Sequence, residues 1–209
     1  GLYERLNDVR TMTLLPGIEK PAEHQALLRD LFDMMQLNYR DYAWIGVADA
    51  KGRVQVASRG MLEGVDLSER LWVQRGLREP YVGDIRMATL LAKLLPVQGD
   101  EPLRLIDVAA PIHDEYGVVV GVVGANLSWQ WAEDLRLGMR QTLNRNEVVE
   151  VFVLNREGKV VLGPKEWRDQ RLTIPSATRG MARQNAAVLE TWPDGRAYLT
   201  GFAPTLGRN

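Results

Sequence analysis

The sequence predicts an α+β protein in which a helical N-terminal segment, residues 1–41, precedes two modules at 42–143 and 144–209. Three observations predict this arrangement. Apolar residues recur at helical spacing over the N-terminal segment, strand–turn–strand patterns come after it, and one of these patterns recurs about a hundred residues later. Each module is expected to be an antiparallel sheet flanked by helices, with about five or six strands.

The N-terminal segment reads as two helices. Apolar residues fall three or four positions apart over residues 1–13, which is typical of a helix with one apolar face. Pro16 and Gly17 interrupt the pattern, because both are unfavourable inside a helix. Pro21 suits a first helical turn, and a wide apolar face comes after it. We therefore expect a long helix over about 1–13 and a second helix that ends before Tyr42.

Residues 42–58 and 148–164 share a strand–turn–strand pattern. In both, a polar residue is followed three positions later by a glycine, which suits a turn that needs a positive φ angle. The two hairpins are therefore expected to occupy equivalent places in the two modules. The corresponding residues are Asp49 and Asn155, Gly52 and Gly158, and Val54 and Val160.

The remaining patterns predict the other elements. The first module is expected to contain a short helix at 66–77, a helical stretch at 87–95, a strand pair at 103–112 and 118–128, and a helix capped by Ser128. The second is expected to contain a weak helix at 175–184 and a strand pair within 186–205.

Composition and charge exclude several functional classes. Of the 209 residues, 45% are hydrophobic and 25% are charged, a balance that supports a packed core. The net charge of −1 provides no basic field for nucleic acid. The absence of cysteine excludes disulfides, thiolate catalysis and cysteine zinc sites. Residues 117–127 are the most apolar stretch, but they are far fewer than the ~20 that a membrane helix needs, so they indicate a buried strand.

No pattern typical of catalysis or cofactor binding is visible. The two histidines, His24 and His113, do not have the spacing of a metal site. The glycines within 117–124 do not form a dinucleotide-binding fingerprint, and no serine lies in a GxSxG motif. The chain is therefore expected not to be an enzyme, and no cofactor or metal ion is expected.

Five segments, in this order and at this spacing, resemble the double-Cache sensor domains of bacterial chemoreceptors, sensor kinases and diguanylate cyclases. The resemblance covers most of residues 1–205 and implies a membrane-distal PAS-like module before a membrane-proximal one, whose C-terminal strand is missing from this sequence. The segments are WIGVADAKGRVQVAS (44–58), DLSERLWVQRGLREPYVGD (66–84), LRLIDVAAPI (103–112), GVVVGVVGANLSWQW (117–131) and GFAPT (201–205).

Two features of the first module stand out as candidate ligand contacts. Arg70 offers a rigid fork for a carboxylate, and Trp72 offers a flat apolar wall. Being two residues apart on a short helix, they share a pocket only if the start of the helix is distorted; the residues alone favour a surface arginine beside a core tryptophan. Asp107 lies inside an apolar strand and needs a partner, which is Arg70, Arg86 or the ammonium group of a ligand.

The resemblance implies specific roles for these residues. Arg70 and Trp72 hold the carboxylate of a ligand, and Asp84 and Asp107 take its amino group. Two departures weaken the match to family members that bind amino acids: Val73 stands where they have tyrosine, and Val82 where they have an aromatic residue. Tyr81 lies one position away and is the remaining candidate contact. A small ligand with a carboxylate stays compatible with the site.

The resemblance also implies the function. The chain is expected to be the periplasmic or extracellular sensor domain of an inner-membrane protein, attached through flanking helices outside this sequence. It would bind an amino acid, an amine or a short carboxylate and relay the binding to a cytoplasmic output domain such as a kinase or a diguanylate cyclase. A weak or parallel homodimer through the N-terminal helix is also expected. A cytosolic PAS-type module that binds a cofactor or dimerises is the alternative.

Overall fold

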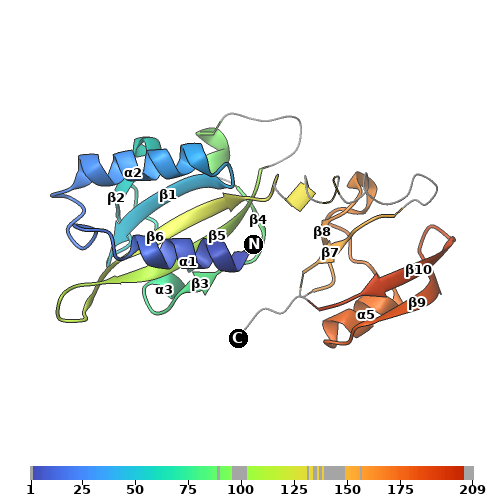
Figure 1. Ribbon diagram of the computed structural model, residues 1–209. Coiled ribbons are helices and arrows are strands. Elements are labelled where there is room, and N and C mark those ends of the chain that lie inside the picture. Colours follow the sequence, from blue (N-terminus) through green and yellow to red (C-terminus); the bar gives the residue numbers. More distant parts are fainter. Residues whose placement is uncertain are drawn as a thin grey trace. The chain divides into compact units, whose positions relative to one another are not determined.

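A computed structural model describes residues 2–88, 90–95, 103–130, 132–133, 136, 138, 149–155 and 157–204. The chain divides into two compact units, Gly1–Trp131 and Ala132–Asn209 (Figure 1). The expected module boundary, between residues 143 and 144, lies outside the described residues. So does most of the helix that Ser128 was expected to cap.

The first unit is built around one antiparallel sheet with the strand order β2-β1-β6-β5-β3, in which β4 also pairs with β5. This confirms the α+β class. The helices are α1 (Leu2–Met12), α2 (Gln25–Asn38) and α3 (Leu71–Gly76), with 3-10 turns at η1 (Ser58–Gly60) and η2 (Leu91–Lys93). The strands are β1 (Tyr42–Asp49), β2 (Val54–Ala57), β3 (Tyr81–Val82), β4 (Arg86–Met87), β5 (Arg104–His113) and β6 (Val119–Ser128).

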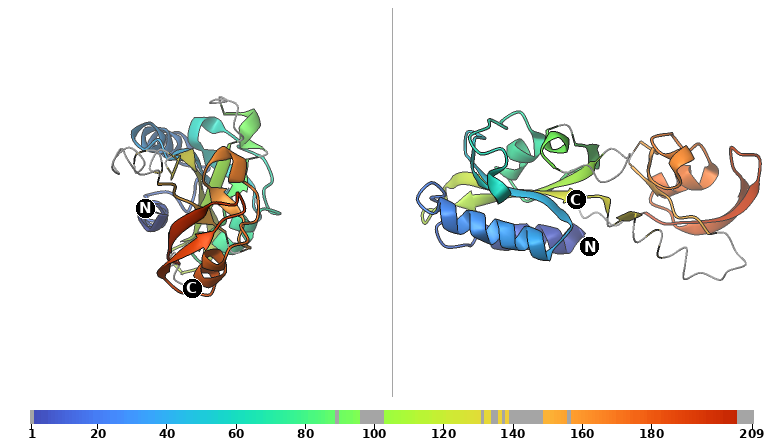
Figure 2. Two further views of the ribbon diagram at one scale, coloured as in Figure 1. Left: turned by 90° about the vertical axis from the view of Figure 1, so that its right-hand side faces the viewer. Right: turned by 90° about the horizontal axis from the view of Figure 1, so that it is seen from above.

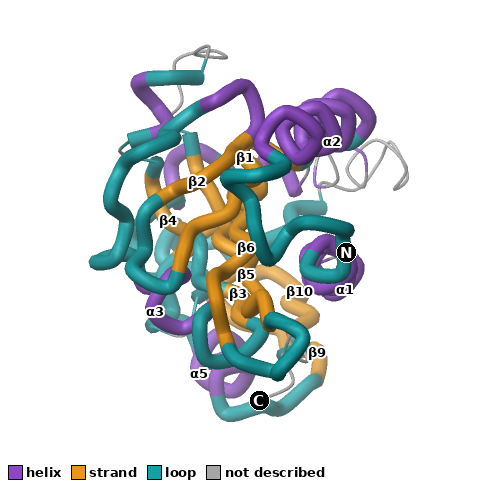
Figure 3. The backbone as a smooth tube through the Cα atoms, turned by 90° about the vertical axis from the view of Figure 1, so that its left-hand side faces the viewer, coloured by secondary structure: helices purple, strands orange, loops and turns teal. Residues whose placement is uncertain are grey.

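Helices cover both faces of this sheet. Helices α1 and α2 lie on one face, and α3 with the segment that precedes it lies on the other, as Figures 2 and 3 show. Because both faces are covered, the central strands β5 and β6 are buried on both sides, which explains their nearly continuous apolar sequence. The N-terminal segment contains two separate helices, α1 with 11 residues and α2 with 14 residues.

The prediction of a helical stretch at 87–95 is wrong. Arg86–Met87 form strand β4 and pair with β5, and only Leu91–Lys93 form a single 3-10 turn. Pairing with a neighbouring strand satisfies backbone groups that a helix would otherwise satisfy internally, so sheet pairing outweighs the local helical spacing at the start of this stretch.

The described part of the second unit contains two strand pairs. Strand β7 (Val153–Leu154) pairs with β8 (Val160–Leu162), and β9 (Ala186–Thr191) pairs with β10 (Ala197–Phe202). Between them lie η3 (Lys165–Trp167) and α5 (Pro175–Met181). A sheet of five or six strands is not seen within the described residues of this unit.

The repeated turn is confirmed by its hydrogen bonds. Gly52 has a φ angle of 84° and donates its N–H to Asp49 O at 2.9 Å. Gly158 has a φ angle of 76° and donates to Asn155 O at 3.0 Å. In both turns the side-chain oxygen of the first residue accepts two backbone N–H groups, which closes the loop with the same chemistry.

No helix among the residues that the structure describes combines the length and the apolar character needed to cross a membrane.

Candidate functional site

The face of the first sheet that carries α3 contains two neighbouring cross-strand rows. One row is made of small residues, because Gly46 pairs with Gly124 and Gly124 pairs with Ala109. A Cβ atom on Gly124 would come within 2.3 Å of the Trp72 ring. Trp72 can therefore lie flat on the sheet only because this strand has glycine at that position.

The next row is polar. Asn126 pairs with Trp44 on one side and with Asp107 on the other. Asn126 and Asp107 are both buried, at 4% and 7% exposure. Two strands that are otherwise largely apolar, β6 and β5, thus place the amide of Asn126 opposite the carboxylate of Asp107, beside the tryptophans. The rings of Trp44 and Trp72 touch, with their centroids 5.9 Å apart.

The start of α3 is displaced from the expected position. The carboxylate of Asp66 accepts the N–H of Ser68 at 2.9 Å, and this bond lowers the pKa of Asp66. The helix begins only at Leu71, and Arg70 precedes it with extended φ and ψ angles of −78° and 131°. This is the distortion that Arg70 and Trp72 need in order to line the same pocket.

That pocket is small. It has a volume of about 20 Å³, which is room for about one water molecule. Among the described residues, its polar lining consists of two guanidinium groups and one amide, and the other lining groups are apolar. The lining residues are Leu62, Leu67, Arg70, Trp72, Arg86, Leu90, Leu91 and Asn126.

Asp107 has its partner within the chain. Arg86 donates Nε to Oδ2 and Nη2 to Oδ1 of Asp107, both at 2.7 Å, so the guanidinium and the carboxylate meet fork to fork. The side-chain amide of Asn126 donates to the same Oδ1 at 2.5 Å. Of the two arginines that the sequence left open as partners, Arg86 is the one that pairs with Asp107.

Arg70 differs from Arg86 in its partners. No hydrogen bond or ion pair of the Arg70 guanidinium is found among the described residues, although the side chain lines the pocket and is half-buried. Its backbone is used instead, because its N–H donates to Leu67 O at 2.8 Å. The pocket therefore has one cation whose charge the described residues leave uncompensated.

The other expected contacts lie at the β3 end of the site. Tyr81 pairs with Ala109 and is half-buried, and the N–H of Gly83 donates to Asp107 O at 2.8 Å. Asp84 lies beyond it as an exposed residue between β3 and β4. The structure thus brings Arg70 and Trp72 together and holds Asp107 behind Arg86. Tyr81, Asp84 and Asp107 are not among the residues that line the small pocket.

Sequence reasoning missed two members of this site. Asn126 was not singled out, although a lone amide inside the run VVGVVGANLS is a signal, since a buried amide needs a partner. Arg86 was considered only as a structural partner. Its reach to Asp107 depends on β4 pairing with β5 at Leu105, two residues away on the same face.

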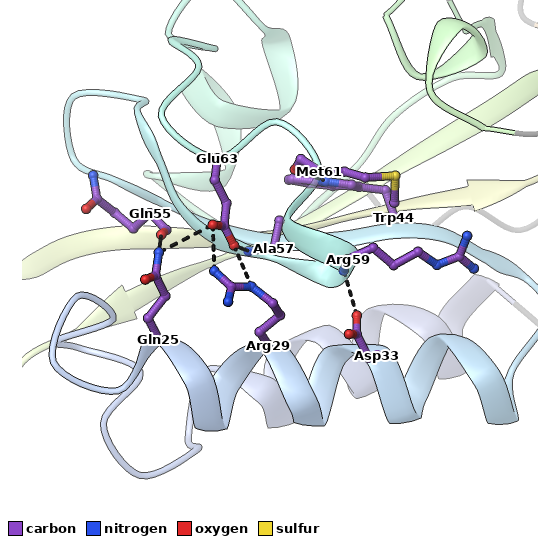
Figure 4. Close-up of polar contacts among 9 residues, drawn as sticks. All are labelled: Gln25, Arg29, Asp33, Trp44, Gln55, Ala57, Arg59, Met61 and Glu63. Atoms are coloured by element: carbon purple, nitrogen blue, oxygen red, sulfur yellow. Dashed lines mark hydrogen bonds and ion pairs between the residues drawn. The ribbon is translucent and has the colours of Figure 1, made fainter.

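One wall of the pocket belongs to a tightly held loop, residues 58–64, shown in Figure 4. Leu62 lines the pocket and has a positive φ angle of 67°. Its neighbour Glu63 accepts two hydrogen bonds from Arg29 of α2, at 3.1 and 2.7 Å. Asp33, one turn further along α2, accepts the backbone N–H of Arg59 at 2.6 Å. These hydrogen bonds therefore attach the pocket wall to α2.

A larger cleft lies elsewhere in the first unit. It has a volume of about 290 Å³ and is lined by the segment between α1 and α2 together with ends of β1 and β6. Its charged lining residues include Lys20 and Asp49, but both Asp49 oxygens already accept hydrogen bonds, one from the backbone N–H of Arg53 and the other from the side-chain amide of Gln55 in β2. No group of three or more metal-ligating side chains occurs among the described residues.

No family model matches the sequence, and no curated protein does. Solved structures do match. The periplasmic sensory domain of the Campylobacter jejuni chemoreceptor Tlp1 matches with a TM-score of 0.58 and 13% identity, over 94% of this chain and 82% of that one. The ligand-binding domain of the Pseudomonas fluorescens chemoreceptor CtaA, solved with L-leucine, matches with a TM-score of 0.59 and 17% identity, over 99% and 81%.

The chain has the fold of these sensor domains. An extracellular ligand binding receptor from Desulfohalobium retbaense also matches, with a TM-score of 0.58 and 16% identity, over 78% of this chain but only 28% of that one. The chain thus spans little more than a quarter of that receptor. The resemblance to double-Cache sensor domains is confirmed at the level of the fold.

Proposed function

We propose that this chain is the extracytoplasmic sensor domain of a bacterial membrane signalling protein and that its first unit binds a small molecule beside α3. The observation that carries this proposal is Arg70, a pocket-lining guanidinium without an ion pair among the described residues. A cation in such a place is suited to the carboxylate of a ligand. The likeness to ligand-binding domains of chemoreceptors supports the same assignment, and CtaA is solved with L-leucine and with L-serine.

Each proposed contact has a physical role. Arg70 takes the acidic end of the ligand, and Trp72 supplies the flat apolar wall. Asp107 and Tyr81 shape the β3 side of the site, where Gly83 ties the strand to Asp107, and Asp84 lies exposed at its end. Attachment to an inner membrane through flanking helices, and a weak homodimer, are parts of the same proposal.

The hydrogen bonds between the pocket wall and α2 suggest how ligand binding is transmitted to α2. A pocket of about 20 Å³ must widen to admit a ligand, and Leu62 is part of its wall. Displacing Leu62 pulls on Glu63, which is bonded to Arg29 of α2. A ligand that favours the widened pocket therefore favours a shifted α2, which is a two-state element of the kind that signalling requires.

The test is a thermal-shift screen of short carboxylates, amines and amino acids. A ligand at about a hundred times its Kd stabilises the folded state by about 2.7 kcal/mol, which raises the Tm by roughly 5–10 °C in a chain of this size. Arg70→Ala should abolish the shift and leave the Tm of the free protein nearly unchanged. Arg75→Ala, on the exposed side of the same helix, is the matched control and should keep the shift. A ligand that binds Arg70→Ala at full strength places the site elsewhere.

A further inference from the structure

We infer that the ligand of this site is a short carboxylate without an amino group, and that Arg86 is the residue that excludes amino acids. The inference rests on the proposed function, since it assigns the chemistry of the ligand at the same pocket. Its central observation is that Asp107, the carboxylate that could receive an ammonium group, is already occupied by a guanidinium from this chain.

The hydrogen-bonding capacity of Asp107 is largely used. Its two oxygens accept three N–H groups, two from Arg86 and one from Asn126, and the residue is 7% exposed. An ammonium group carries three donors and no acceptor, so it needs oxygens that these groups have taken. To reach Asp107, a ligand ammonium must displace a bidentate guanidinium and leave Arg86 without that carboxylate.

The charges that line the pocket point the same way. Among the residues that the structure describes, Arg70 and Arg86 are the charged residues of the lining, and the others contribute the Asn126 amide and apolar groups. Asp107 compensates Arg86, which leaves the charge of Arg70 for the ligand. One carboxylate matches this balance, whereas an ammonium group would face the uncompensated guanidinium of Arg70 in a partly desolvated site and would be repelled.

The apolar lining indicates the body of the ligand. Trp72 and four leucines, Leu62, Leu67, Leu90 and Leu91, surround the cationic end. The volume of about 20 Å³ favours a chain of few carbons, since every added methylene requires further displacement of these side chains. The class of ligand is therefore a monocarboxylate with a short aliphatic chain.

The experiment compares compounds that differ only in the α-amino group. Acetate, propionate and butyrate are titrated against the protein by calorimetry beside glycine, L-alanine and L-2-aminobutyrate. We expect at least one member of the first series to bind, at least about tenfold more tightly than its amino counterpart. An amino acid that binds as tightly as its matched carboxylate overturns the inference while leaving the proposed function intact. If no compound of either series binds, the ligand class fails, and the Arg70 screen then decides separately whether the proposed function fails with it.

A variant then tests the role of Arg86. Arg86→Gln removes the fork from Asp107, so the amino acids should gain at least about tenfold in affinity, while the matched carboxylates still bind through Arg70. Adding Asp107→Asn to this variant should cancel the gain, because the ammonium group loses its acceptor. Arg75→Gln, on the exposed side of α3, is the control and should change neither series. If Arg86→Gln is folded, as judged by circular dichroism, and still rejects the amino acids, Arg86 is not the excluding residue. If it does not fold, the comparison of the two series on the wild type still decides the ligand class.

Discussion

The turns of the two hairpins are alike in their bonds and different in their surroundings. Beyond the bonds within each turn, Leu67 donates to Gly52 O at 2.8 Å and Leu172 donates to Gly158 O at 3.0 Å. Among the described residues, the core that follows the first turn contains a cluster of eleven buried residues, which includes Trp44 and Trp72. The corresponding cluster of described residues in the second unit has four members, Val160, Leu172, Ile174 and Ala177.

Turn chemistry and site formation are therefore separable. A polar residue and a positive-φ glycine suffice to build the turn in either unit. The pocket of the first unit depends instead on α3, because Arg70 directly precedes this helix and Trp72 lies on it. In the second unit the later helix is α5, near whose start the N–H of Ser176 donates to Glu190. The second unit also leaves Leu189 and Leu199, which pair across β9 and β10, highly exposed at 73% and 76%.

The largest loss of stability is expected when a turn glycine is replaced, and it tests how tightly each turn is packed. Replacing Gly52 or Gly158 by alanine places a side chain at a positive φ angle, which costs roughly 1–2 kcal/mol in either turn. At Gly52 the new Cβ would also lie 2.6 Å from the backbone of Ser68, whereas at Gly158 its nearest neighbour is the flexible end of Met181, at 3.3 Å. Gly52→Ala should therefore destabilise the protein by about 3 kcal/mol or more, and Gly158→Ala by less.

Urea unfolding followed by circular dichroism measures both variants, and hydrogen exchange shows which unit has lost protection. Equal losses of stability in the two variants would show that the backbone at Ser68 shifts as easily as the side chain of Met181. The first turn would then not be the more tightly packed one.

A smaller effect concerns Glu190, which has no counterpart at the start of α3. Burial raises the pKa of Glu190, but hydrogen bonds from the Ser176 hydroxyl and N–H outweigh it, so the pKa lies below its ordinary value of 4.5. A carboxyl group with a lowered pKa stabilises the fold above its ordinary pKa, and this contribution disappears as the pH falls through the lowered value. Glu190→Gln should cost about 1–2 kcal/mol at neutral pH.

The pH dependence separates this carboxylate from the others in the chain. The difference in unfolding free energy between wild type and Glu190→Gln should be constant above about pH 5 and shrink below pH 4.5. Urea titrations at several pH values measure it. A difference that stays the same down to about pH 3 would rule out the ionised carboxylate as its source.

The smallest effect tests whether the two turns are interchangeable in chemistry. Asp49→Asn and Asn155→Asp keep a side-chain oxygen for both backbone N–H groups. The side chain of Gln55, which donates to the second oxygen of Asp49, can turn its own amide oxygen toward the new NH2 group, so each variant should change stability by less than about 0.5 kcal/mol. Asp49→Ala and Asn155→Ala lose these bonds and should each cost about 1 kcal/mol. Thermal denaturation of the four variants gives the ranking, and a costly Asp49→Asn would assign a role to the charge that Asn155 does not share.

Local patterns in the sequence were sufficient for the elements whose chemistry is local. The turn at Asp49 and Gly52 and its repeat at Asn155 and Gly158 were predictable, because a positive φ angle and an oxygen cap depend on a few adjacent residues. The strands β5 and β6 were predictable because continuous apolar runs mark strands that are buried on both faces. The displaced start of α3 was not predictable from local patterns. The sequence showed only that Arg70 and Trp72 can share a pocket if the start of the helix is distorted.

The α+β class, the repeated turn and the need of Asp107 for a partner thus follow from the order of the residues alone. Three other features come from the folded chain: Arg86 pairs with Asp107, Asn126 donates to the same carboxylate, and the stretch at 87–95 begins as a strand. They depend on strand register, because pairing of Arg86 with Leu105 and of Asp107 with Asn126 joins residues that are about twenty positions apart in the chain. Which cation reaches a buried carboxylate depends on such long-range pairing and on packing, neither of which is encoded in spacing along the chain.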